Sequence, residues 1–183
     1  YRLGQKALKK NFEEHLKILG DTGIDLIILE AMTSEVDTVK TLIDCSKKVN
    51  LPTWLSVSCA FDLETNKVML GYQESIGNTK AEIYGDFDNA IKQFSSMHDG
   101  PILIAHSDIK IINDAIKIIK NNHRGFIGTY PNNGYFKKPH WKSIENFTPE
   151  NYLNEAKSWV KNGSQIIGGC CGVGPDLIKG LSE

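Results

Sequence analysis

Residues 165–172 read Gln165-Ile166-Ile167-Gly168-Gly169-Cys170-Cys171-Gly172, a short apolar run that ends in two adjacent thiols between glycines. A short apolar run bounded by turn residues is typical of a buried strand. Adjacent cysteines rarely bond to each other without strain, whereas both sulfurs can reach one metal ion. Thiolate is a ligand that Zn²⁺ prefers, and the flanking glycines let the backbone turn tightly. The motif therefore predicts a metal site at a strand end, with a third ligand from elsewhere in the chain.

This apolar run is the last of five that alternate with helical patterns along the chain. Runs that are apolar on both faces and separated by helices favour a parallel sheet with right-handed crossovers. We therefore predict a single α/β domain over residues 1–183, in which the stretch 60–85 is a loop or a small hairpin. The predicted strands are 24–29, 53–58, 101–105, 125–129 and 165–168, and the predicted helices lie around 8–19, 36–43, 87–97, 109–119, 149–163 and 175–181.

Polar residues stand where the predicted strands end, and their placement favours one kind of parallel sheet. Active sites of (β/α)8 barrels are built at the carboxyl ends of the strands, and a complete barrel needs about 250 residues. We therefore predict the C-terminal portion, about five βα units, of a TIM-type (β/α)8 barrel within a longer natural chain. An open parallel α/β sheet is the alternative. The strand-end residues are Glu30, Ser58-Cys59, His106-Ser107, Tyr130 and Cys170-Cys171.

Composition and charge exclude several classes of partner. The chain is 40% hydrophobic and 23% charged, which is enough apolar surface for a globular core. A net charge of -1 provides no basic field for nucleic acid and no cationic face for a membrane. Four cysteines without a secretory leader or an apolar run of about 18 residues favour a reducing, cytoplasmic setting.

The segment 166–178, which reads Ile-Ile-Gly-Gly-Cys-Cys-Gly-Val-Gly-Pro-Asp-Leu-Ile, resembles the closing motif of the homocysteine S-methyltransferase family. The stretches 26–30 and 128–134 also resemble that family and occur in the expected order, so the similarity covers the whole chain. The resemblance implies a zinc-dependent transferase. In the family a Zn²⁺ held by three cysteines binds the thiol of homocysteine, which takes a methyl group from an onium-type donor to give methionine.

The resemblance implies that Cys170 and Cys171 are two of the zinc ligands. The family's third cysteine would stand at Ser107, and His106 precedes that position. Two thiolates and one imidazole leave a fourth position open for substrate, so we predict zinc ligation by His106, Cys170 and Cys171. The alternative is that His106 is only a polar strand-end residue or that the metal site has decayed, because a serine hydroxyl is a poor zinc ligand.

The resemblance also implies substrate contacts. Glu30 matches the glutamate that holds the amino group of homocysteine, and a carboxylate at a barrel mouth pairs well with an ammonium. Tyr130 and Asn132 are expected to shape the substrate pocket. The alternatives are a solvated strand-end glutamate and a plain turn at 131–134.

The remaining thiols and imidazoles are predicted to be structural. Cys59 is expected to be a core or rim residue rather than a fourth ligand, and Cys45 is expected to pack on a helix. The other histidines have no partners in sequence and are predicted to lie at the surface: His15, His98, His123 and His140.

Homocysteine and a methyl donor are the expected partners, and the sequence leaves the identity of the donor open. One alternative function is a phosphate-binding barrel enzyme that uses the backbone of Gly168-Gly169 as a cradle. Another is a non-catalytic zinc-binding module or a degenerate partner subunit. Because five parallel strands cannot close a barrel, we also expect the 183-residue chain to self-associate if it stands alone.

Overall fold

A five-stranded parallel sheet forms the centre of the protein, for which a computed structural model describes residues 4–31, 35–145 and 147–182. The sheet order is β1-β2-β6-β7-β10, so the strands lie side by side in the order in which they occur along the chain. This confirms the predicted α/β class with a parallel sheet. The strands are β1 (Ile27–Ala31), β2 (Thr53–Val57), β6 (Ile102–Asp108), β7 (Ile127–Asn132) and β10 (Ile166–Ile167).

All five predicted strands are present, but three of them, β1, β6 and β7, extend further at their carboxyl ends. The strand predicted over 101–105 continues as β6 to Asp108, where it still pairs with Asn132 of β7. A register shift between Ala105 and Asp108 lets the two strands remain paired beyond the bend. The first strand begins at Ile27 rather than at residue 24, because its pairing with β2 starts at Thr53.

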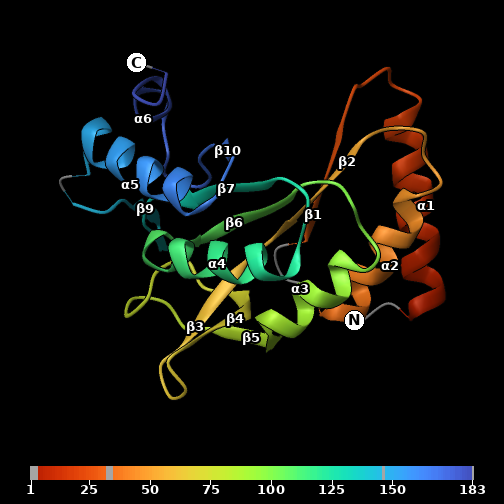
Figure 1. The fold of residues 1–183 in the computed structure, drawn as a ribbon, viewed down its shortest axis with the longest axis horizontal. Helices are drawn as coiled ribbons and strands as arrows, with labels where there is room; N and C mark the ends of the chain where they lie inside the picture. Colours follow the sequence, from red (N-terminus) through yellow and green to blue (C-terminus); the bar gives the residue numbers. More distant parts are fainter. Residues whose placement is uncertain (1–3, 32–34, 146, 183) are drawn as a thin grey trace.

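Helices connect the parallel strands, and Figure 1 shows them following one another in chain order from α1 and α2 at one end of the molecule to α5 and α6 at the other. The predicted start of α5 is confirmed. Thr148 caps the helix by accepting a hydrogen bond from the Asn151 N–H, and Pro149 occupies the first turn. The helices are α1 (Gln5–Gly20), α2 (Val36–Ser46), α3 (Phe87–Ser95), α4 (Ile112–Asn122, after a 3-10 turn at Ile109–Ile111), α5 (Pro149–Asn162) and α6 (Pro175–Lys179).

Two small antiparallel sheets lie at the carboxyl edge of the parallel sheet. The stretch 60–85, predicted to be a loop or hairpin, forms a three-stranded sheet of β3 (Cys59–Asp62), β4 (Lys67–Tyr72) and β5 (Glu82–Asp86). Val68 and Leu70 alternate with more exposed residues and turn one face of β4 into the core. The second is a hairpin of β8 (Tyr135–Lys137) and β9 (His140–Lys142), which directly follows residues 131–134 and which the sequence analysis did not predict.

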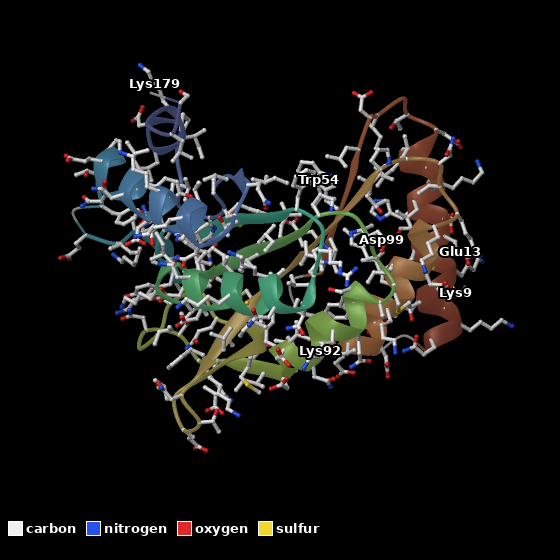
Figure 2. All side chains as sticks on the ribbon, in the orientation of Figure 1. Lys9, Glu13, Trp54, Lys92, Asp99 and Lys179 are labelled. Carbon is white, nitrogen blue, oxygen red and sulfur yellow. The ribbon has the colours of Figure 1, made fainter. Side chains whose placement is uncertain are left out.

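The α1–α2 pair covers the end of the sheet that is remote from α6. Figure 2 shows Lys9 and Glu13 on α1 at this end, and Glu13 Oε1 lies 2.6 Å from Lys48 Nζ. Cys45 is buried between the two helices, as predicted for a packing residue. No helix among the described residues combines the length and the apolar character needed to cross a bilayer.

The prediction that all four remaining histidines lie at the surface is wrong for His98 and His123. Both are buried, and their Nε2 atoms lie 3.3 Å from the Pro101 carbonyl and 3.0 Å from the Gly100 carbonyl. The turn before β6 supplies these carbonyls, which give each ring a partner that the sequence does not reveal. His15 and His140 are exposed, as predicted.

The outer strands of the described parallel sheet are β1 and β10, and each of them pairs with a single neighbour in that sheet. An unpaired strand edge is a template for association with another chain. The expected self-association stays a prediction.

Candidate metal centre

His106, Cys170 and Cys171 come together at the carboxyl edge of the sheet, although 64 residues separate the histidine from the first cysteine. His106 Nδ1 lies 3.6 Å from Cys170 Sγ and 3.3 Å from Cys171 Sγ, and the two sulfurs are 3.9 Å apart. The histidine is buried and both cysteines are half-buried. Within the described ranges, this is the one group of three ligating side chains whose donor atoms converge closely enough for a metal ion.

The spacing of the three donor atoms fits a tetrahedral zinc site. With Zn–S bonds of about 2.3 Å and a Zn–N bond of about 2.0 Å, tetrahedral angles place two sulfurs about 3.8 Å apart and a sulfur and a nitrogen about 3.5 Å apart. The distances between the side chains agree with these values to within about 0.3 Å. Two thiols and one imidazole are also the borderline-soft donor set that Zn²⁺ favours. The residues present therefore fit the metal.

The backbone of the double-cysteine loop is fixed against the end of β7. The Cys170 N–H donates to the Pro131 carbonyl at 3.0 Å, and the Asn133 N–H donates to the Cys171 carbonyl at 2.8 Å. Gly172 has a φ of 77°, and a Cβ there would collide with the Trp141 indole nitrogen and with the Asn133 carbonyl. Glycine is therefore required at 172 for both conformation and space, and it lets the chain turn directly after the thiols.

The local backbone of β6 explains why the histidine, and not the serine after it, faces the sulfurs. His106 has a φ of 44° at the register shift of β6, a conformation uncommon for a residue other than glycine. Ser107 is fully buried and turned elsewhere, because its Oγ donates to the Ala105 carbonyl and accepts the Cys59 N–H at 2.8 Å. The sequence position where the family's cysteine was expected thus has no part in the cluster.

Burial shifts the pKa values of two members of the cluster, His106 and Cys171. It lowers the pKa of His106, against the opposing effect of the Glu74 and Glu30 carboxylates. The imidazole is therefore neutral at pH 7 and has a lone pair for a metal. Burial, together with the neighbouring Cys170, raises the pKa of Cys171 to about 11, so this thiol gives up a proton when it becomes a ligand.

These pKa shifts predict the pH dependence of zinc affinity. Ligation by two thiols releases two protons, whereas a neutral imidazole releases none above its lowered pKa. We expect the logarithm of the zinc association constant to rise by about two for each pH unit between pH 6.5 and 8. Chelator competition across this range measures the slope. A slope near three would indicate three thiol ligands, and a slope near one would remove one cysteine from the site.

Glu30 and Tyr130, which the sequence predicted to bind substrate, lie next to each other across the sheet. Glu30 extends from β1 and Tyr130 from β7, and the tyrosine hydroxyl lies 3.1 Å from Glu30 Oε1. The same hydroxyl is hydrogen-bonded to Ser56 Oγ of β2, a contact that the sequence did not suggest. Burial raises the pKa of Tyr130, so its hydroxyl stays protonated and can donate to the carboxylate. The backbone next to Tyr130 is joined to the cysteine loop, because the Gly168 N–H donates to the Thr129 carbonyl at 2.9 Å.

Asn132, the third predicted substrate residue, is buried with both of its amide atoms unpaired. Its side chain is 1% exposed, and neither Oδ1 nor Nδ2 has a hydrogen-bond partner. Its chain neighbours Pro131 and Asn133 hold the cysteine loop. A buried amide without a partner costs free energy, which is consistent with a side chain that meets a polar ligand.

Cys59 is fully buried in the core, as predicted, and lies outside the cluster. The sequence analysis missed Tyr72, the last residue of β4, and Glu74, which follows it; both lie close to His106. The period-two pattern of Val68, Leu70 and Tyr72 is the signal that could have indicated a strand leading to the site.

A comparison with known proteins assigns the chain to a family. The family described as homocysteine S-methyltransferase matches residues 1–183. The chain belongs to this family. In this member of the family a serine, Ser107, stands where the third cysteine was expected, and the preceding residue, His106, faces the double-cysteine loop.

Two curated relatives illustrate the degree of similarity within the family. The selenocysteine methyltransferase of Astragalus bisulcatus is 24% identical over 181 residues, which cover 96% of this chain and 49% of that protein. Homocysteine S-methyltransferase 3 of Zea mays is 25% identical over 185 residues, which cover 97% of this chain and 50% of that protein. The chain thus spans about half the length of the curated relatives it matches.

Proposed function

We propose that the protein transfers a methyl group from an onium-type donor to the thiol of homocysteine, giving methionine, with Zn²⁺ held by His106, Cys170 and Cys171. The observation that carries this proposal is the convergence of one imidazole nitrogen and two sulfurs at tetrahedral spacing. Membership of the homocysteine S-methyltransferase family supports the reaction class. If Cys170 and Cys171 were only part of a structural turn, nothing would require His106 to face them in a strained backbone conformation.

Zn²⁺ bound at such a site lowers the pKa of a thiol that reaches it and so makes a thiolate available near neutral pH. Three protein ligands leave a fourth position open, as in other catalytic zinc sites. Replacing one thiolate by a neutral imidazole removes one negative charge from the ligand set. The thiol of the substrate should then lose its proton more easily and be a slightly weaker nucleophile.

Glu30 and Tyr130 would hold the amino group of homocysteine. The Glu30 carboxylate is exposed and is hydrogen-bonded to the Tyr130 hydroxyl, which fixes its direction without neutralising its charge. An ammonium group is a suitable partner for such a carboxylate. The unpaired amide of Asn132 would contribute a further polar contact to the pocket.

The Glu30→Gln variant tests this assignment. We expect homocysteine to bind about 30-fold more weakly, because a charge-assisted hydrogen bond between an ammonium and a carboxylate is worth on the order of 2 kcal/mol, while zinc affinity changes little. Isothermal titration with homocysteine and chelator competition for zinc measure the two affinities separately. Glu64→Gln, which alters an exposed carboxylate in the turn after β3, serves as the control. Unchanged homocysteine affinity in Glu30→Gln would remove this residue from the site.

We also infer that the five-stranded sheet is part of a TIM-type (β/α)8 barrel. Its strand order follows the chain order without reversal, whereas a doubly wound sheet reverses at a switch point. The side chains of the candidate site extend from the carboxyl ends of β1, β6 and β7 and from the loop after β10, as active-site residues of barrels do. This architecture supports a site assembled between strands that close around it.

The alternative of a phosphate cradle at Gly168-Gly169 has little support. The Gly168 N–H donates to the Thr129 carbonyl, and the Cys170 N–H donates to the Pro131 carbonyl, so two of the three backbone donors at residues 168–170 are already used. A non-catalytic zinc module differs from the proposed enzyme in one measurable respect. The full-length protein, loaded with zinc and given homocysteine with a panel of sulfonium and ammonium donors, should form methionine. Zinc binding without methionine formation from any donor would favour the non-catalytic module.

A further inference from the structure

The second ring nitrogen of His106 is hydrogen-bonded to Tyr72 at the end of β4, and Tyr72 is in turn hydrogen-bonded to Glu74. His106 Nε2 lies 3.0 Å from the Tyr72 hydroxyl, and this hydroxyl lies 2.8 Å from Glu74 Oε1. The rings of Tyr72 and His106 also stack, with centroids 4.9 Å apart and planes inclined by 12°. The imidazole is therefore restrained both in its plane and at the nitrogen remote from the sulfurs.

The chemistry of these groups fixes the direction of each hydrogen bond. An ionised carboxylate can only accept, so the Tyr72 hydroxyl donates its proton to Glu74. The tyrosine oxygen then accepts from His106, which requires the proton of the neutral ring to be on Nε2. The lone pair is consequently on Nδ1, the nitrogen that faces Cys170 and Cys171. The arrangement selects the tautomer that a metal at the cluster needs.

Glu74 is itself held by a hydrogen bond from the β8–β9 hairpin. Its Oε2 accepts the backbone N–H of Phe136 in β8 at 2.7 Å, while Oε1 serves Tyr72. The carboxylate side chain is 12% exposed and lies 3.8 Å from His106 Nε2. It therefore joins the β3–β5 sheet to the β8–β9 hairpin beside the candidate metal centre.

We propose that Tyr72 and Glu74 are positioning residues that orient His106 and fix its tautomer, so that Nδ1 is the metal-binding atom. This inference rests on the metal site of the proposed function. Outer hydrogen-bond partners of this kind raise the basicity of a ligating histidine and hold its ring. The Glu74 carboxylate also places a negative charge beside a ligand set that has one thiolate fewer than the three-cysteine set of the family.

The matched variants are Tyr72→Phe and Glu74→Gln, with Tyr84→Phe as the control. Tyr72→Phe keeps the stacked ring and removes only the hydroxyl. Tyr84 carries the same kind of contact in the same small sheet, since its hydroxyl lies 2.9 Å from Glu82 Oε2. Loss of the Tyr84 hydroxyl therefore reports any general cost of removing a tyrosine–glutamate hydrogen bond.

Two measurements on the full-length protein test the proposal. The first is ¹⁵N NMR of His106 in the metal-free protein, where we expect the proton on Nε2 in the wild type and in Tyr84→Phe, and a mixture of tautomers in Tyr72→Phe. The second is chelator competition for Co²⁺ and Zn²⁺. Loss of a hydrogen-bond partner of a ligating histidine typically weakens metal binding by about 10- to 100-fold, and we expect this loss of affinity for Tyr72→Phe. Glu74→Gln should weaken metal binding in the same direction, because its amide carries no charge and has one oxygen to accept where the carboxylate has two.

The two readouts separate the positioning role from the metal site itself. A wild-type protein that binds no metal would overturn the proposed function, and with it the metal-binding role of Nδ1. Unchanged tautomer and unchanged metal affinity in Tyr72→Phe, with metal bound by the wild type, would overturn the role of Tyr72 and Glu74 alone. A wild-type proton on Nδ1 would also contradict the proposed hydrogen-bond direction.

Discussion

The Cys171→Ala variant is expected to lose both zinc and methyl transfer. Structural zinc sites bind with about 10–16 kcal/mol in total, so removal of one of three protein ligands should cost about 4 kcal/mol, or about a 1,000-fold weaker affinity. Metal analysis of the purified full-length protein and an assay of methionine formation measure the two losses.

Cys45→Ala is the matched control for this variant. Cys45 is a free thiol buried between α1 and α2, beside Lys9 and Glu13 (Figure 2) and remote from the cysteine loop. We expect Cys45→Ala to keep its zinc and its methyl transfer even if it lowers stability. Retention of stoichiometric zinc by Cys171→Ala would show that the site assignment is wrong.

The second large effect is expected to separate His106 from Ser107. Only the histidine faces the sulfurs, whereas the serine side chain is turned toward Cys59 and the Ala105 carbonyl. His106→Ala should weaken zinc binding by about 100-fold or more, as expected for loss of a direct ligand. Ser107→Ala should keep zinc affinity within about twofold and instead lower the free energy of unfolding by about 1–3 kcal/mol, because the buried Cys59 N–H loses its acceptor.

Chelator competition and urea unfolding, applied to both variants, measure these outcomes. Equal zinc affinity in His106→Ala and the wild type would exclude the histidine as a ligand. Loss of zinc by Ser107→Ala, with an unchanged free energy of unfolding, would indicate that residue 107 is the third ligand.

The strands and helices of the α/β domain could be predicted because their patterns are local. A run such as Ile102-Leu103-Ile104 is apolar on both faces, and both faces are buried in the sheet. The small antiparallel sheet was predicted only as a loop or a small hairpin, because the apolar Met69 between Val68 and Leu70 weakens the contrast between the two faces of β4. His98 and His123 were misjudged because their partners are backbone carbonyls, which every sequence contains.

In the candidate site, too, the local features could be predicted from the sequence and the long-range contacts could not. The double-cysteine loop is contiguous, so its chemistry is visible in the sequence. The orientation of His106 depends on a positive φ and on a register shift between β6 and β7, and neither has a sequence signature for histidine. Tyr72 reaches the histidine from 34 residues away, and Ser56 reaches Tyr130 from 74 residues away. Such contacts follow from the assembled sheet and not from spacing along the chain.

X-ray absorption at the zinc K-edge of the zinc-loaded, full-length protein tests the central claim most directly. The account predicts two sulfur ligands at about 2.3 Å and at least one nitrogen ligand at about 2.0 Å from the protein, with a third sulfur appearing when homocysteine is added. Three sulfur ligands before homocysteine is added, or an unchanged spectrum after its addition, would contradict it.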